Sequence, residues 1–329
     1  MRYKTVVLST ILTLLIGVLL VLFYIYFTLV GKLPVMGEQV SNPKGIIHIL
    51  SIYGYGKKPG ELLNGPTGVA ADREGRIFIS DTQHKRVLIF DERGVFLGRL
   101  GTFGNQRGQL SQPDGIATGP DGTIYVCDPG RNAVLAFGSD LKFKNEIDNE
   151  QIPLAVLDAG DRLYVLGYDH LSIYDKNFRL LTKIGKRGKD IGDFDFPHGI
   201  AILRNGNIVV SDGNNMRLVA YKSGTNKAAW VVGEPPKKMD TEQRKFGLPV
   251  GIALDNNDNI YVMDALRSTV HIYSPDGKKL AEYGEMGDRE GQFNYPSDIA
   301  YLGGDKFAIS DTMNNRVQIV RIAAPAQGQ

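Results

Sequence analysis

A motif of proline followed by a small apolar run recurs along the chain and constrains its fold more than any other feature. Five copies have the form Pro-x-(Gly/Asp)-(Ile/Val)-Ala, and a sixth, degenerate copy is Pro-Leu-Ala-Val. They begin at Pro66, Pro113, Pro153, Pro197, Pro249 and Pro296. Successive prolines are separated by 47, 40, 44, 52 and 47 residues. This period is typical of propeller blades and of solenoids built from paired helices.

The pattern inside each copy separates these two fold classes. A turn signal such as Asp121-Gly122 precedes a short β-branched and aromatic run such as residues 124–128, and two further runs of this kind follow. Such runs are too short for helices, and the glycine and Asp-Gly punctuation excludes a helical solenoid. Four strands per copy and six copies predict an all-β, six-bladed β-propeller over residues 46–322.

The two ends of the predicted propeller complement each other. The last copy supplies three strands and stops at Ile322, whereas residues 46–54 have the pattern of a fourth strand and precede the first proline. Pairing of residues 46–53 with residues 316–322 would leave no open sheet edge between the first and last blades. We therefore expect the first strand to complete the last blade.

Residues 5–30 contain no charged side chain. A helix of this length spans about 39 Å, enough to cross a hydrocarbon core of about 30 Å. The run is longer than the apolar part of a cleaved signal peptide, and no small-x-small cleavage site follows it. Arg2 and Lys4 precede it, which favours a cytoplasmic N-terminus. We expect a single-pass signal anchor in the cell membrane (residues 1–31), a linker (32–45), a propeller outside the cytoplasm and a disordered tail (323–329).

Charge and cysteine content exclude two classes of function. Arg2, Lys4 and Lys32 are the only charged residues up to position 32, so the rest of the chain carries 35 of the 38 basic residues and all 36 acidic ones. A nearly neutral globular part argues against a nucleic-acid binder. The single cysteine, Cys127, cannot form an internal disulfide or a cysteine zinc site alone, and we expect it in the core.

The repeat resembles the NHL repeat: Pro-x-Gly-Ile-Ala, then Ile-Tyr-Val-Ser-Asp, then Arg five residues beyond the Asp. Residues 212–217 and 311–316 match this motif almost completely, and the resemblance covers residues 46–322. The family includes the peptidyl-hydroxyglycine amidating lyase, sensor domains of bacterial receptor kinases, and RNA- or protein-binding modules of TRIM-type proteins. The resemblance implies the fold but not the function.

An aspartate ends the second strand of five copies, 15 residues after the proline. We expect it to act as a structural clamp that faces an arginine five residues further on. A ring of carboxylates could also suggest calcium, but a feature repeated in nearly every blade is more typical of structure than of a unique site. The predicted clamps are Asp81, Asp128, Asp212, Asp264 and Asp311, with Arg86, Arg217 and Arg316.

Candidate ligand-binding residues lie where the copies differ. The residue after each proline is expected at the mouth of the central channel, which makes Asp114, His198 and Ser297 candidates. The loops after the second strands and the loops between blades share one face, here called the loop face; the other turns form the turn face. Candidates on the loop face are His84, Arg131, Tyr168, His170, Asn215 and Arg267. Inter-blade loops there are basic, as at residues 57–58 and 186–189.

These features favour a membrane-anchored binding or scaffold module that recognises a protein partner or a small anionic ligand on the loop face. No catalytic residue, cofactor or metal site is assigned. The alternative is a metal-dependent lyase or hydrolase at the channel mouth, using Asp114 and His198. The amidating lyase family places zinc-binding histidines after such prolines, but only His198 matches, and zinc needs three protein ligands. Zinc and calcium stay open as alternatives. No Gly-x-Ser-x-Gly nucleophile elbow occurs.

Overall fold

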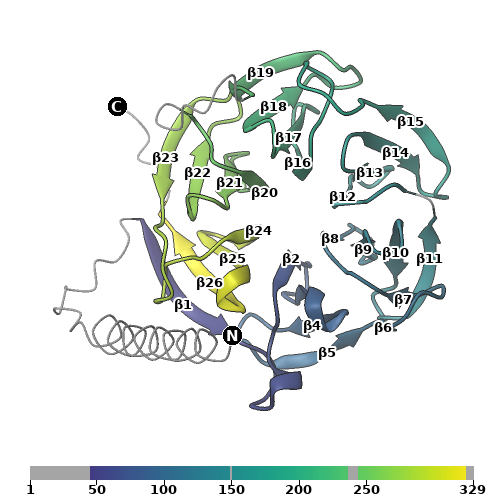
Figure 1. Cartoon of the computed structure of the whole chain (residues 1–329), viewed down its shortest axis with the longest axis vertical. Coiled ribbons are helices and arrows are strands. Elements are labelled where there is room, and N and C mark those ends of the chain that lie inside the picture. The colour runs from purple at the N-terminus through teal and green to yellow at the C-terminus, as the bar shows by residue number, and fades with distance from the viewer. Residues whose placement is uncertain (1–44, 149, 236–243, 324–329) are drawn as a thin grey trace, which may run out of the picture. The chain divides into compact units, whose positions relative to one another are not determined.

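The structure is a computed structural model that describes residues 45–148, 150–235 and 244–323. In these residues, six four-stranded antiparallel sheets are arranged as blades around a central channel (Figure 1). The first strand of each blade lines the channel and the fourth lies at the outer rim. The all-β, six-bladed propeller expected from the repeat is therefore confirmed.

The strands follow the repeat in register. Blade 1 comprises β2 (Pro66–Ala71), β3 (Ile77–Asp81), β4 (Arg86–Phe90) and β5 (Phe96–Leu100). Blade 2 comprises β8 (Ile116–Thr118), β9 (Ile124–Asp128), β10 (Ala133–Phe137) and β11 (Phe143–Ile147). Blade 3 comprises β12 (Ala155–Asp158), β13 (Arg162–Leu166), β14 (Leu171–Asp175) and β15 (Leu180–Ile184). Blade 4 comprises β16 (Pro197–Ile202), β17 (Ile208–Asp212), β18 (Arg217–Tyr221) and β19 (Ala228–Gly233). Blade 5 comprises β20 (Pro249–Leu254), β21 (Ile260–Asp264), β22 (Thr269–Tyr273) and β23 (Lys279–Tyr283).

Blade 6 is assembled from both ends of the propeller. It comprises β24 (Pro296–Gly303), β25 (Lys306–Asp311), β26 (Arg316–Ile322) and, as its outer strand, β1 (Ile46–Ile52). β1 pairs antiparallel with β26, with Ile46 opposite Ile322 and Ile52 opposite Val317. The ring closure expected from the sequence is confirmed.

Short strands and 3-10 turns lie on the loop face. A parallel pair, β6 (Thr102–Phe103) and β7 (Gln109–Leu110), lies between blades 1 and 2. Three 3-10 turns, η1 (Pro59–Glu61), η2 (Thr82–His84) and η3 (Thr312–Asn314), lie in an inter-blade loop and after two second strands.

The hydrophobic core lies mainly between neighbouring blades. In one cluster Ile79 of blade 1 packs with Ala308 and Ile319 of blade 6, and all three are fully or almost fully buried. Cys127 is completely buried beside Leu163 of the next blade, as expected for a core residue. Burial of a large side chain such as Ile79 or Ile319 contributes roughly 1.5–3 kcal/mol, so packing between blades stabilises the ring.

The glycine of the Pro-x-Gly motif allows the inner strands to approach one another. A Cβ atom added at Gly68 would lie 2.2 Å from the Asp114 carbonyl oxygen, and one at Gly115 would lie 2.2 Å from that of Leu154. The same approach recurs at Gly199, 2.5 Å from the Val250 carbonyl oxygen. A larger residue would force adjacent blades apart. Blade 6 is different, since it carries Asp298 at this position.

Within the described residues, no helix is long and apolar enough to cross a membrane. The predicted anchor at residues 5–30, nearly all of the predicted linker and residues 324–329 of the predicted tail lie outside the described ranges.

Candidate functional site

The aspartates that end the second strands hold the loops between blades. Each of the five is completely buried. In blades 1, 4 and 6 its carboxylate accepts the backbone N–H located two residues before the blade's proline, at 2.7–2.8 Å. The carboxylates of Asp128 and Asp264 each accept two such N–H groups, from Ser111 and Gln112 and from Gly247 and Leu248. These contacts are those of a structural clamp.

A cation accompanies each clamp, at one of two positions. In blades 1, 4 and 6 it is the arginine five residues after the aspartate: Arg86, Arg217 and Arg316 donate to their aspartates at 2.7–2.9 Å. Where that position holds Ala133 or Thr269, the cation lies three residues after the aspartate, as Arg131 or Arg267. Either way the guanidinium donates to backbone carbonyls of an inter-blade loop, for example those of Gly60, Gln109, Asp190, Lys245 and Arg289.

Blade 3 lacks the aspartate and contains a different buried cluster. His170 and Glu150 lie within hydrogen-bonding distance and are only 1% and 3% exposed. Ser172 and Tyr174 also donate to the Glu150 carboxylate. These hydrogen bonds outweigh the opposing effect of burial and hold the pKa of Glu150 below its usual value. The His170 ring occupies the space beside Gly167, where a larger residue would collide with it.

Most of the predicted loop-face residues thus make contacts that hold the loops in place. His84 contacts Asp81 at 3.1 Å, and Asn215 is completely buried between Asp212 and the Gly188 carbonyl. The Tyr168 ring packs edge-on against Phe196 at the channel mouth. A ligand-binding role for His84, Arg131, Tyr168, His170, Asn215 and Arg267 stays a prediction.

The residues that follow the six prolines converge on one cavity. It has a volume of about 410 Å³ and opens at the loop-face end of the channel. Its lining includes all six of them: Thr67, Asp114, Leu154, His198, Val250 and Ser297. The Ser297 hydroxyl is bonded to the Thr67 carbonyl and to the Thr312 hydroxyl, both at 2.7 Å. Of the three residues predicted at the channel mouth, Asp114 and His198 are the two with ionisable side chains.

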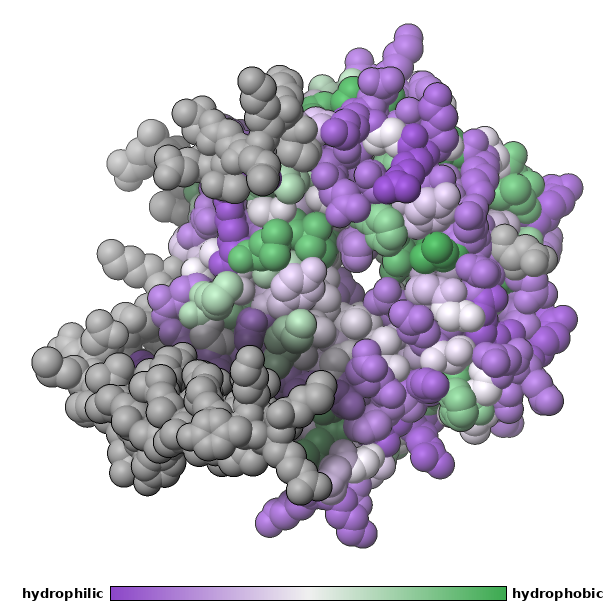
Figure 2. Space-filling model, in the orientation of Figure 1, coloured by the Kyte–Doolittle hydropathy of each residue, from purple (hydrophilic) through white to green (hydrophobic). Residues whose placement is uncertain are grey.

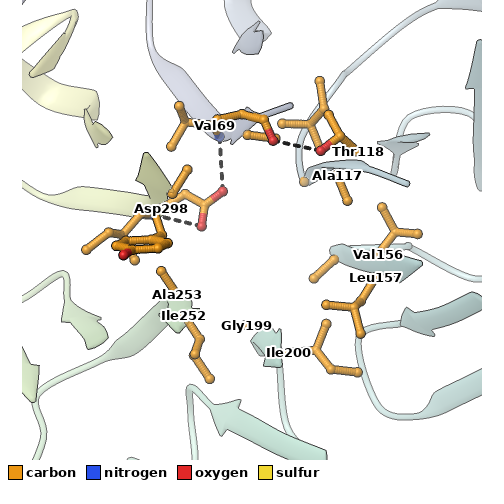
Figure 3. A pocket seen from close by; sticks show the side chains of 18 of the residues that line it. Val69, Ala117, Thr118, Val156, Leu157, Gly199, Ile200, Ile252, Ala253 and Asp298 are labelled. Carbon is orange, nitrogen blue, oxygen red and sulfur yellow. Dashed lines mark hydrogen bonds between the residues drawn. The ribbon is translucent and has the colours of Figure 1, made fainter. Parts of the chain in front are cut away.

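A second cavity of about 230 Å³ continues along the channel. Aliphatic side chains of the inner strands line most of it, including Val69, Val156, Leu157, Ile200 and Ile252 (Figure 3). Gly115, His198 and Asp298 line both cavities and therefore mark the neck between them.

Asp298 is the site residue that the sequence analysis missed. Its carboxylate accepts the backbone N–H groups of Val69, at 3.0 Å, and of Ile299, at 2.9 Å (Figure 3). Burial raises the pKa of Asp298 to about 7, against the effect of these two bonds, and the Asp114 carboxylate adds to the rise. The available signal was its place in the repeat, where four other copies have glycine.

Two further ionisable residues, Asp114 and His198, line the mouth cavity. Burial raises the pKa of the Asp114 carboxyl, while His198 and a hydrogen bond from Thr67 oppose this rise. The Nδ1 atom of His198 lies 2.9 Å from the Phe196 carbonyl oxygen. A carbonyl only accepts, so Nδ1 carries a proton.

The rest of the mouth is largely apolar. Leu154, Phe196, Leu248, Val250 and Tyr295 line it. Hydrophobic side chains gather around the central opening in the view of Figure 2. A polar group and an apolar body could therefore be bound at once.

The donors at the neck do not make a metal site. Across the described ranges, no three His, Cys, Asp or Glu side chains are grouped so that they could hold a metal ion. The residues present thus do not fit the zinc centre that the alternative function would need.

Family models match the blades directly. A model described as NHL repeat matches residues 194–221, and one described as 6-bladed beta-propeller matches residues 67–177. The chain therefore carries an NHL repeat within a six-bladed β-propeller.

Among curated relatives, this NHL-repeat propeller matches peptidylglycine alpha-amidating monooxygenase of Rattus norvegicus with 25% identity over 138 residues. The corresponding protein A of Xenopus laevis is 27% identical over the same length. Each match covers 40% of this chain, and the chain spans only 14% of the length of these relatives.

Solved structures share the fold of this NHL-repeat propeller. A streptogramin B lyase superposes with a TM-score of 0.61 at 11% identity, over 86% of this chain and 100% of the lyase. A protein of unknown function from Bacteroides thetaiotaomicron superposes with a TM-score of 0.62 at 16% identity, over 85% and 76% of the two chains. At these identities the likeness establishes the fold alone.

Proposed function

We propose that this protein is a binding module that takes its ligand at the loop-face mouth of the channel, and that a membrane anchor at residues 5–30 holds it outside the cytoplasm. The observation that carries the proposal is the convergence of six blade positions on one cavity, with Asp114 in its lining and His198 and Asp298 at its neck. Concave sites with an apolar lining and a few convergent polar groups are the usual form of ligand sites.

The neck favours a ligand with a protonated amine on an apolar body. The amine would donate to the carboxylates of Asp114 and Asp298 and would lower their pKa values, since a nearby positive charge stabilises the ionised form. The apolar body would cover Leu154, Phe196 and Val250. A cavity of about 410 Å³ accepts a small molecule or the inserted end of a protein partner.

The rim of the loop face supports an anionic outer part of the same partner. Lys57, Lys58, Lys186, Arg187 and Lys189 are all exposed there. Such a basic rim attracts acidic surfaces and speeds their association. A partner with an acidic surface around an inserted amine would satisfy both features.

The test is thermal unfolding of the full chain in detergent with a panel of amines that carry apolar groups, each matched to its carboxylic acid. A fitting amine at about 100 times its dissociation constant should stabilise the protein by about 2.7 kcal/mol. The Asp114→Asn/Asp298→Asn double variant should lose this stabilisation, while an Asp288→Asn variant, altered at an exposed loop, should keep it. Equal stabilisation of all three proteins would place the ligand elsewhere.

One observation favours a second candidate, an acid–base enzyme at the same mouth. A carboxyl whose pKa is about 7 lies at the neck with His198, and general acids and bases work best near the operating pH. The fold is also that of a streptogramin B lyase. An activity that Asp298→Asn abolishes without weakening ligand binding would favour the enzyme.

A further inference from the structure

Five large apolar side chains on the outer rim of blades 6 and 1 are partly exposed to solvent, although the Phe96 ring also stacks on Tyr55. Ile47 and Ile49 on β1 are 49% and 42% exposed. Val95, Phe96 and Leu97, at the start of β5, are 52%, 37% and 51% exposed. We call these five residues the apolar rim band.

The two strands that carry the band lie side by side. The side chains of Leu50 and Ile52 on β1 lie 3.4–3.5 Å from the point where a Cβ at Gly94 would be, in the turn that leads into β5. Figure 1 shows β1 and β5 as neighbours along the rim. Both strands start at the turn face, so the band follows one edge of the ring. Large apolar side chains that are exposed on adjacent strands are typical of an interaction surface.

The fringe of the band contains two tyrosines and one exposed arginine. Tyr53 and Tyr55 are 49% and 37% exposed, and their hydroxyls contact Arg316 and Arg86, which are paired with clamp aspartates. Arg99 is exposed and pairs with none of the described residues. Aliphatic residues flanked by tyrosine and arginine are typical of protein surfaces that lie in the membrane interface, where an exposed positive charge such as that of Arg99 attracts anionic lipid.

The chain connectivity favours the lipid bilayer as the occupant of the band. β1 is the first strand of the propeller, and only residues 31–45 separate it from the uncharged segment 5–30. Fully extended, these 15 residues reach about 50 Å. We propose that the apolar rim band rests on the lipid bilayer, so that the propeller lies edge-on with blades 6 and 1 against the membrane. This inference rests on the anchoring proposed above.

The experiment compares two matched positions on opposite sides of the ring. Leu97 is the second residue of β5, and Leu181, which is 45% exposed, is the second residue of β15 in blade 3. A single cysteine replaces either leucine in a Cys127→Ser background of the full chain and carries an environment-sensitive fluorophore. The protein is reconstituted in vesicles of phosphatidylcholine and phosphatidylglycerol with and without brominated acyl chains.

Edge-on docking should make bromine quenching at Leu97→Cys about three times that at Leu181→Cys or more, since only the first lies in the interface. Equal quenching at both positions would mean that the turn face lies on the bilayer and would overturn the proposal. Fluorophore shielding at Leu97→Cys without bromine quenching, together with cross-linking between copies, would overturn it in favour of a second copy of this chain.

Flotation of the same vesicles separates the failure of this inference from the failure of anchoring. Protein that does not float with the lipid contradicts the proposed anchor. Protein that floats but shows no preferential quenching at Leu97→Cys leaves the anchor standing and rejects the edge-on contact. Circular dichroism of each labelled variant verifies that the propeller has folded.

Discussion

At the scale of single residues, Asp298 concentrates the unusual chemistry of this propeller. Four blades have glycine at the equivalent position, because the next blade's backbone approaches it closely. In blade 6 the side chain instead reaches the inner strand of blade 1 and accepts the Val69 N–H. The substitution therefore introduces an ionisable group into the neck of the channel and uses a hydrogen bond to compensate part of its burial.

We expect the free energy of unfolding to depend on pH through the Asp298 carboxyl. Its pKa is about 7 in the folded protein and about 3.9 in an unfolded chain, so the folded state binds more protons between these values. Stability should then fall as pH rises from about 4 to 7, and Asp298→Asn should remove this fall. Unfolding temperatures of the two proteins at pH 5 and pH 8 measure it: the variant should gain on the parent at pH 8. Parallel profiles would contradict the assignment, and Asp288→Asn, at an exposed loop, is the control.

The sequence could predict only part of this site. Position within the repeat placed Asp114, His198 and Ser297 at the channel mouth, since the residue after each proline occupies an equivalent place in every blade. The contact of Asp298 with Val69 joins residues 229 apart and depends on how tightly blades 6 and 1 approach. Burial of that carboxyl follows from the same approach, and no local pattern encodes it.

At the scale of the strand and its loop, the arginine that accompanies the clamp aspartate occurs at either of two sequence positions. It lies five residues after the aspartate in three blades and three residues after it in two, yet donates to the same kind of loop carbonyl. This alternation explains why the sequence presented Arg131 and Arg267 as variable loop residues. The two arginines have the same structural role at different positions, and their predicted role in ligand binding stays a prediction.

Moving the cation in blade 5 should therefore be tolerated. Arg267→Ala removes hydrogen bonds to the carbonyls of Lys245 and Arg244 and should cost about 1–2 kcal/mol of unfolding free energy. Adding Thr269→Arg, which reproduces the arrangement of blades 1, 4 and 6, should restore half of the loss or more. Urea unfolding measures both proteins, with Arg99→Ala as an unpaired arginine control. A double variant no more stable than Arg267→Ala would show that the two positions are not equivalent.

At the scale of the whole molecule, the fold was predictable from two sequence features. Each repeat contains the pattern of four strands, and the strand missing from the last repeat is present at the start of the propeller. The pairing of β1 with β26 is the contact on which the ring depends, since its loss leaves blade 6 with three strands and an open edge. The sequence showed this through a missing strand at one end and a surplus strand at the other.

A covalent link across the closure should stabilise the ring. Ile47 and Arg321 lie directly opposite each other in the register, and both are exposed. Cysteines at these two positions, in a Cys127→Ser background, should form a disulfide and raise the unfolding free energy by about 2–4 kcal/mol relative to the reduced protein. Urea unfolding with and without reductant measures the gain. The offset pair Ile49→Cys/Arg321→Cys should give no such gain, and an equal gain from it would contradict the register.

The closure also fixes an order of events during synthesis. β1 leaves the ribosome first, but its partner ends at Ile322, and the 276 positions between Ile46 and Ile322 take roughly 14–55 s to translate at about 5–20 residues per second. Throughout that interval an edge strand with five aliphatic residues among seven has no β26 to pair with. Blades 1 to 5 can form while the chain grows, whereas the strand made earliest is incorporated last.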